Sequence, residues 1–230
     1  MLYFTGDTHG DIQRFAKRNI KTLKNGDTLF VCGDFGFVWD NSSAEQKMLN
    51  KLTKLPFLIC FIDGTHENFK LLDAYPVVPW HGAKAHKIRD NIFHLMRGQL
   101  YDFEGKTVFA LGGGENPELV LKDDEEITER PEVPTKEEML AGVESLEKAQ
   151  YKVDYVITHE PPAKVRDFLM LSSTENSTVT ALGAYLDELA AQTEYGKWFF
   201  GSIHTDKFIS SSSVSVFSNI IEGESGKKIN

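Results

Sequence analysis

Short apolar runs that end in clusters of glycine, aspartate and histidine constrain the fold of this chain more than any other feature. Each run has the length and composition of a buried strand. The polar clusters that follow these runs are Gly6–Asp11, Gly33–Asp34, Asp63–Asn68, Thr158–Pro162 and Gly201–His204. In open α/β sheets, ligands bind beyond the carboxyl ends of the strands, so this pattern predicts a binding site at one sheet edge.

The first third of the sequence alternates between strand and helix patterns. Apolar runs at 2–5, 28–32 and 56–62 predict three buried strands. Between them, apolar residues recur at helical spacing from Ile12 to Leu23 and from Ala44 to Leu52. This βαβαβ order predicts a parallel sheet with helices packed against it.

The middle of the chain changes character. Short strands are predicted at 92–95, 100–103 and 107–111, and short glycine-containing turns separate them. Such spacing is typical of antiparallel hairpins, so we expect these strands to form a second sheet. The predicted fold class is therefore α/β with two sheets.

The rest of the chain adds further helices and strands. After the Gly112–Gly114 run, an acidic segment with prolines precedes Thr135, which begins a predicted helix with Glu138 completing a capping box. The other expected elements are a strand at 155–158, a helix at 177–192, and strands at 198–200, 207–210 and 214–217. We see no internal repeat, and we expect one domain over residues 1–230 with an irregular acidic insert at about 114–134.

Composition excludes several classes of protein. Hydrophobic residues make up 41% and charged residues 26% of the chain, which is typical of a globular protein. No apolar run approaches the roughly 20 residues of a membrane span, and the N-terminus does not resemble a secretory signal. The net charge of −9 disfavours binding of duplex nucleic acid. An acidic chain can still bind phosphate if a metal ion supplies the positive charge.

The number and positions of the cysteines indicate the redox state of the compartment in which the protein resides. Cys32 and Cys60 are the two cysteines, and both lie inside apolar runs. We interpret them as buried free thiols in a reducing compartment, which predicts a cytoplasmic protein. A disulfide between them is the alternative.

The polar clusters contain metal-binding side chains. If the strands are parallel, Asp7, His9, Asp34, His159 and His204 meet at one edge. Mixed carboxylate and imidazole sets suit Mn, Fe or Zn better than Mg or Ca. Each cluster alone has a simpler interpretation, as a helix cap, a turn or a structural histidine. Those interpretations do not explain why five separate strands end alike, so the joint pattern predicts a metal site.

The order of these clusters resembles that of the calcineurin-like metallophosphoesterases. That family has Gly-Asp-x-His, Gly-Asp, Gly-Asn-His-Glu, Thr-His and Gly-His-x-His in this order, and the resemblance spans Thr5 to about Ile221. The matching stretches are Asp7-Thr8-His9, Gly33-Asp34, Gly64-Thr65-His66-Glu67, Thr158-His159 and Gly201-Ser202-Ile203-His204. The resemblance implies an α-β-β-α sandwich with two metal ions between two sheets, and hydrolysis of a phosphate ester.

The resemblance also assigns roles to individual residues. It implies that the first metal is held by four side chains: Asp7, His9, Asp34 and His204. Asp34 would bridge to a second metal, for which His159 is another ligand. His66 matches the histidine that assists the leaving group or steadies the transition state, so His66 and Asp34 are the expected catalytic residues.

Two departures from the family pattern concern the second metal. The asparagine before His66 is Thr65 here, and the first histidine of the last motif is Ser202. Neutral hydroxyls are poor ligands for divalent transition metals, so we expect one well-held ion, with Mn favoured over Fe or Zn, and a weak or absent second ion. Thr65 also replaces the residue that contacts the substrate phosphate in the family.

Two functions remain open at this stage. The first is a phosphoesterase with an altered second metal site, acting on a phosphorylated small molecule or nucleotide. The second is a catalytically impaired pseudoenzyme that binds a nucleotide, another phosphorylated ligand or a protein partner. The sequence leaves open the identity of the substrate, the native metal and the oligomeric state.

A few further residues are candidates for substrate contact. Arg97 follows a predicted strand and could face the site, and Glu115, with Asn116, follows the triple glycine. His94 is interpreted as structural. His81 and His86 are placed in a loop with basic residues, more typical of a solvated loop than of a steering surface for anions.

Overall fold

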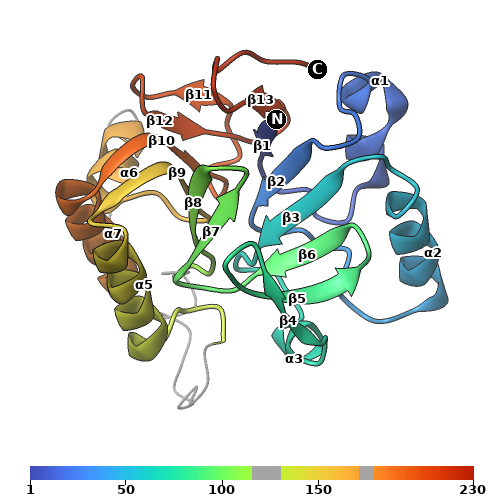
Figure 1. Cartoon of the computed structure of the whole chain (residues 1–230), viewed down its shortest axis with the longest axis horizontal. Coiled ribbons are helices and arrows are strands. Elements are labelled where there is room, and N and C mark those ends of the chain that lie inside the picture. Colours follow the sequence, from blue (N-terminus) through green and yellow to red (C-terminus); the bar gives the residue numbers. More distant parts are fainter. Residues whose placement is uncertain (116–130, 171–178) are drawn as a thin grey trace.

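The computed structural model describes residues 1–115, 131–170 and 179–230, and it contains two mixed β-sheets with helices. The predicted α/β class is confirmed (Figure 1). Across the first sheet the strands are β13 (Ile221–Glu222), β1 (Leu2–Thr5), β2 (Thr28–Cys32), β3 (Leu58–Ile62), β6 (Ile92–Leu95), β5 (Ala83–Arg89) and β4 (Val77–Trp80). Across the second they are β11 (Lys207–Phe208), β12 (Ser213–Ser215), β10 (Glu194–Phe200), β9 (Lys152–Thr158), β8 (Lys106–Leu111) and β7 (Gln99–Phe103).

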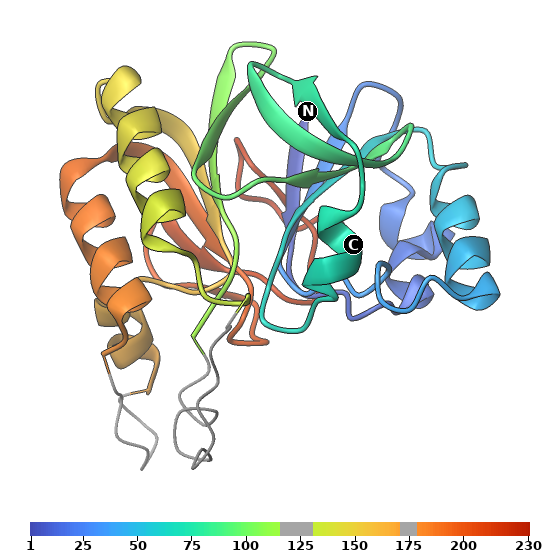
Figure 2. The ribbon, with the colours of Figure 1, turned by 90° about the horizontal axis from the view of Figure 1, so that it is seen from below.

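Helices cover the outer faces of both sheets, as Figure 2 shows. The described helices are η1 (Ile12–Phe15, a 3-10 helix), α1 (Lys17–Ile20), α2 (Ser43–Leu52), α3 (Phe69–Asp73), α5 (Lys136–Lys148), α6 (Ala163–Met170) and α7 (Ala181–Gln192). The capping box of α5 is confirmed, because Thr135 and Glu138 each accept a backbone N–H of the other. Among the described residues, no helix combines the length and apolar character that crossing a bilayer requires.

The alternation of side chains along the strands explains the layering. On β2, Leu29 and Val31 belong to the outer core under the helices, whereas Phe30 belongs to the core between the sheets. Successive side chains of a strand point to opposite faces, so an uninterrupted apolar run needs cover on both sides. Phe4 of the first sheet stacks on Phe199 of the second with ring centroids 4.0 Å apart, which joins the sheets through one core.

Parallel pairing brings the polar clusters together. In the first sheet β1, β2 and β3 run parallel, and in the second β8, β9 and β10 run parallel. The loops that follow these strands therefore emerge at common edges. Interactions between Asp7 and His204 and between Asp34 and His159 show that the two edges adjoin.

One strand lies in a different sheet from the one we predicted. Ile92–Leu95 pairs parallel with β3 and antiparallel with β5, so it belongs to the first sheet, not to the second. The segment Ala83–Arg89, expected to be a loop, is β5, and His86 is buried within it. Its sequence alternates basic and small residues, so it lacks the apolar run that marks a central strand.

Two helices differ in length or continuity from those predicted from the sequence. The helix expected from Ile12 to Leu23 is a 3-10 turn and one α-helical turn, broken at Ala16, whose backbone is extended. The helix expected at 177–192 begins at Ala181, with Thr180 as its cap, and residues 171–178 lie outside the described ranges. Most of the acidic insert, residues 116–130 with Asn116, also lies outside them.

Candidate metal centre

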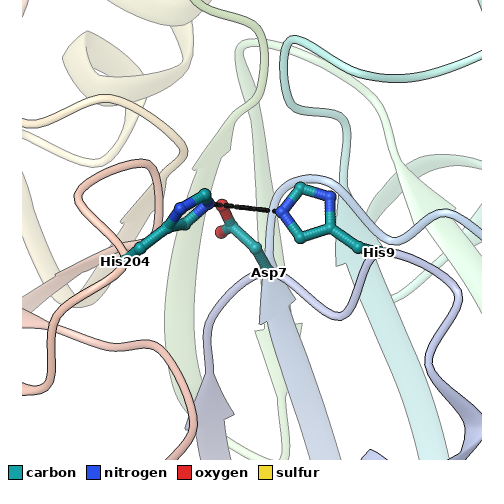
Figure 3. Close-up of side chains that lie close together, drawn as sticks. All are labelled: Asp7, His9 and His204. Carbon is teal, nitrogen blue, oxygen red and sulfur yellow. Dashed lines mark hydrogen bonds and ion pairs between the residues drawn. The ribbon is translucent and has the colours of Figure 1, made fainter.

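Asp7, His9 and His204 form the first cluster of the site (Figure 3). Asp7 follows β1 with a side chain closed to solvent, and its Oδ2 lies 2.9 Å from His204 Nε2. His9 Nε2 lies 3.2 Å from His204 Nε2 and 3.9 Å from Asp7 Oδ2. One carboxylate and two half-exposed imidazoles thus converge on a small volume.

Asp34, His66 and His159 lie beside this cluster. His66 contacts Asp34 twice, through its backbone N–H to Oδ1 at 2.8 Å and its ring Nδ1 to Oδ2 at 3.1 Å. His159 is buried, and its Nδ1 donates to the carbonyl oxygen of Cys32 at 3.1 Å, because a carbonyl oxygen only accepts. This fixes the tautomer and leaves Nε2, 3.9 Å from Asp34 Oδ1, free to act as a ligand.

The structure brings all five predicted ligands together. Within the part of the chain that the structure describes, two groups have ligand atoms within 4.8 Å of one another: Asp7, His9 and His204, and Asp7, Asp34 and His159. Asp7 belongs to both groups, whereas the family resemblance implies Asp34 as the bridging residue. Asp34 Oδ2 also lies 3.9 Å from His9 Nε2, so each of the two carboxylates lies near both His9 and His159.

Three of these residues have left-handed backbones. The φ angles are 45° at His9, 46° at Asp34 and 51° at His204. This conformation is uncommon for residues with a side chain, and it persists where the surroundings enforce it, often at functional sites. One constraint is visible, because the backbone N–H of His9 donates to the carbonyl of Asp34 at 2.8 Å.

Two glycines of the sequence motifs are required by close packing against the carboxylates. A Cβ atom at Gly64 would collide with Asp34 Oδ1, and a Cβ atom at Gly201 would collide with Asp7 Oδ1 and the carbonyl of Cys32. These glycines therefore let the loops of both sheets approach the two carboxylates. They explain why the motifs contain glycine at positions that bind nothing themselves.

The electrostatics of the site favour an added positive charge. Burial by itself would raise the pKa of Asp34, but His159 and the hydrogen bonds from His66 outweigh it and hold the pKa below its ordinary value. The hydrogen bond to Asp7 raises the pKa of His204. Buried carboxylates thus draw protons onto neighbouring imidazoles. Asp7 Oδ1 is also buried, and within the described chain it has no hydrogen-bond partner.

The residue types fit a divalent transition ion. Two carboxylates and three imidazoles are hard and borderline donors, which suit Mn, Fe or Zn. A cation among Asp7, His9 and His204 would give Asp7 Oδ2 and the two facing imidazole nitrogens a common partner. The unpartnered Asp7 Oδ1 lies toward His159, on the side of the second group.

Hydroxyl groups stand at the two positions that depart from the family pattern. Thr65 Oγ1 lies 3.1 Å from His66 Nδ1, beside the catalytic candidate. Ser202 Oγ is buried and, among the described residues, makes no hydrogen bond. Both hydroxyls lie in loops of the site, so substituting asparagine for Thr65 and histidine for Ser202 tests whether longer ligand side chains at these positions add metal binding.

Arg97 and Glu115 have protein partners. Arg97 Nε donates to Asp63 Oδ2 at 2.9 Å and Nη1 to Glu138 Oε2 at 3.1 Å. Glu115 lies near Arg166, where its charge favours the protonated guanidinium although burial lowers the pKa of Arg166 overall.

The remaining histidines lie elsewhere. His86 Nδ1 and His94 Nδ1 are 3.0 Å apart, and His94 Nε2 lies 3.1 Å from Asp63 Oδ1. His81 Nδ1 donates to the carbonyl of Asp102 at 2.7 Å.

Several supporting residues were missed by sequence reasoning. Arg14 Nη1 donates to the backbone carbonyl of Asp7 at 2.8 Å, and Asp206 accepts three backbone N–H groups of residues 217–219 behind His204. Glu67 belonged to a recognised motif, but it is buried and its Oε1 accepts the Phe35 N–H at 2.8 Å. No local pattern identifies such residues, because their partners lie 7 to 32 residues away and come into contact with them only when the chain folds.

No model of a protein family matches the chain, and no curated protein matches it. One similar solved structure is described as "Putative 5'-Nucleotidase" from Staphylococcus aureus in complex with alpha-ketoglutarate. It is 13% identical with a TM-score of 0.48, covering 96% of this chain and 50% of that one. This chain spans half the length of that protein, and a likeness this distant carries no argument about function.

Proposed function

We propose that this chain is a metal-dependent phosphoesterase with the two-sheet sandwich of the calcineurin-like metallophosphoesterases. Its substrate would be a phosphate ester of a small molecule or nucleotide. The convergence of Asp7, His9, Asp34, His159 and His204 at the ends of four separate strands supports this most directly. It is the arrangement implied by the ordered motifs of the sequence.

The ligand sets differ in strength. Asp7, His9 and His204, with Asp34 beside them, would hold one divalent ion. Asp34 and His159 would contribute to a second, weaker position, where Thr65 and Ser202 offer only hydroxyls. A divalent ion held by the ligands of this site would stabilise the charge on the phosphoryl group as a Lewis acid. It would also make a bound water molecule more acidic.

His66 would act on the leaving group. Its side chain is 65% exposed, while its Nδ1 contacts Asp34 Oδ2 at 3.1 Å. That contact orients the ring and leaves Nε2 without a contact to Asp34. With both ring nitrogens protonated, Nε2 would donate a proton or a hydrogen bond to the departing oxygen. Asp34 is thus a ligand candidate and also the residue that positions His66.

A binding protein without catalysis is the second candidate. The specific observation that favours it is the unpartnered, buried hydroxyl of Ser202 together with Thr65 at the other second-metal position. A site reduced to one ion retains phosphate affinity but loses the paired stabilisation of attacking and leaving oxygens that two-metal sites provide.

Hydrolysis of chromogenic phosphate monoesters and diesters with and without Mn²⁺ tests these functions. We expect Mn²⁺-dependent turnover by the unmodified protein and a loss of at least 100-fold in Asp7→Asn. Asp90→Asn, on an exposed side chain, is the matched control. Turnover found only in the Thr65→Asn/Ser202→His variant would support the binding protein and refute the enzyme.

A further inference from the structure

A cleft of about 650 Å³ adjoins the proposed metal centre. Its lining joins His9 and His66 of that centre to Trp39, Asp40 and Met48. His66 is the residue proposed to act on the leaving group. The part of a substrate beyond its phosphate would therefore extend from His66 into this cleft.

Trp39 is the unusual member of the lining. It exposes 51% of its surface, whereas Trp198 in the core exposes 2%. A large aromatic ring left in water forgoes the stabilisation that burial would give, and such rings are common where ligands bind. The exposed indole is therefore available to a ligand in the cleft.

The backbone beneath this indole is fixed on both sides. The N–H of Trp39 donates to Glu45 Oε2 at 2.6 Å, and the carbonyl of Trp39 accepts from Asn68 Nδ2 at 2.5 Å. Glu45 is buried in the first turn of α2. Asn68 lies two residues after His66 and caps α3, so the position of Trp39 is tied to that of the catalytic candidate. Because the backbone is already fixed, only the side-chain torsions of Trp39 would lose entropy when a ligand stacks on its ring.

The charges of the residues that line the cleft determine which ligand groups can bind in it. Asp40 and Glu45 are carboxylates, and none of the described residues that line the cleft is a lysine or an arginine. A second anionic group would be repelled there, whereas an uncharged ring with N–H or C–H edges would not. The cleft thus differs from the metal centre, which is the part suited to a phosphate.

We propose that the cleft binds the non-phosphate part of the substrate and that Trp39 stacks on a flat, uncharged ring within it. The substrate class is then a phosphate ester of an alcohol that carries a nucleobase or an aryl ring. This inference rests on the proposed function, because the metal centre is what holds the phosphate end.

Phosphonates test the proposal without hydrolysis, because their carbon–phosphorus bond resists the reaction. The affinities of 5'-deoxyadenosine 5'-phosphonate, phenylphosphonate and methylphosphonate would be measured by calorimetry on the full chain with Mn²⁺. Trp39→Ala and Trp39→Phe would be compared with Trp80→Phe, which makes the same change in β4 outside the cleft. Thermal unfolding of each variant shows whether it is folded.

We expect the unmodified protein and Trp80→Phe to bind one or both ring compounds at least fivefold more tightly than methylphosphonate. Trp39→Ala would lose this preference, by roughly 5- to 100-fold, as expected for a lost aromatic stack, and Trp39→Phe would keep most of it. A stronger preference for the adenosine compound identifies a nucleoside, and equal preference identifies any aryl ring. A preference that survives in folded Trp39→Ala, or none in the unmodified protein, would overturn the proposal.

The outcomes separate this proposal from the one on which it rests. Mn²⁺-dependent hydrolysis without any ring preference would reject the role of Trp39 and leave the esterase intact. A Trp39-dependent preference without hydrolysis of any ester would support the cleft and reject the esterase.

Discussion

At the scale of single residues, the candidate site depends on two carboxylates whose positions are determined by neighbouring residues. Asp7 and Asp34 face the imidazoles. Arg14 donates a hydrogen bond to the backbone carbonyl of Asp7. Gly64 and Gly201 leave space for the carboxylates of Asp34 and Asp7, respectively. Asp63 lies three residues before His66 in the sequence, and its carboxylate contacts the side chains of Arg97 and His94. Each carboxylate at this edge therefore has a distinct environment and a distinct role.

The role of His66 gives the first prediction. His66→Ala is expected to lower kcat by about 10²- to 10⁴-fold, the usual contribution of a positioned acid or base. Mn²⁺ content should stay unchanged, because His66 belongs to neither ligand group. Steady-state kinetics and metal analysis measure both, with His81→Ala as the control. A loss of metal in His66→Ala would mean that His66 is a ligand instead.

Asp63 gives a prediction about stability and pH. Burial by itself would raise the pKa of Asp63, but Arg97 and His94 outweigh it and hold the pKa well below its ordinary range. Its stabilising contribution is therefore full above the unfolded value of about 3.9 and is lost as the pH falls toward the lower folded pKa. Asp63→Asn should lower the free energy of unfolding at pH 7 by about 3–5 kcal/mol, because Arg97 then stays buried without its partner.

Chemical denaturation at several pH values measures this effect. The difference between the unmodified protein and Asp63→Asn should narrow below about pH 4. Asp90→Asn, whose side chain is 97% exposed, should change stability by less than about 0.5 kcal/mol. A difference that is independent of pH would show that the charge of Asp63 is not what stabilises the fold.

At the scale of elements, strand ends determine what the loops can do. The residues after β1, β2, β9 and β10 reach one site because these strands share their direction within each sheet. Left-handed residues at His9, Asp34 and His204 then turn the chain sharply enough to present each side chain.

Gly201 tests this account of the loops. Gly201→Ala should weaken Mn²⁺ binding by about 10- to 100-fold, comparable to loss of a partner that orients a ligand, because its Cβ would displace Asp7. Gly226→Ala is the matched control, since its Cβ would meet nothing closer than 3.5 Å. It should cost about 1 kcal/mol of stability for its left-handed backbone and leave Mn²⁺ affinity as it was. Equal metal affinity in both variants would contradict the packing argument.

The sequence predicts some elements better than others for physical reasons. Strands β1, β2 and β3 are buried on both faces, so their apolar runs are evident. Strand β5 was missed because its alternating basic residues resemble a loop, and β6 was then placed in the wrong sheet. Local residue patterns do not encode which strand a short run will pair with.

The same limit applies to the site. The five candidate ligands could be predicted because each directly follows an apolar strand or closes a motif after one. Trp39 could not, because its anchors Glu45 and Asn68 become its neighbours only through folding. Arg14 was missed for the same reason.

At the scale of the whole molecule, the site depends on both sheets. Asp7 and Asp34 come from the first sheet, and His159 and His204 come from the second. The shared core around Phe4 and Phe199 holds the sheets together and so holds the ligands together. The net charge of −9 is consistent with a protein that binds phosphate through a metal ion instead of through basic side chains.

The proposed metal centre predicts a definite metal content for the protein. Elemental analysis after equilibrium dialysis against Mn²⁺ would compare the unmodified protein with Asp7→Ala and Asp90→Ala. We predict one firmly held ion per chain in the unmodified protein and in Asp90→Ala. Asp7→Ala should lose it, because Asp7 belongs to both ligand groups. An unmodified protein without bound metal, or an Asp7→Ala variant that keeps its metal, would contradict the account.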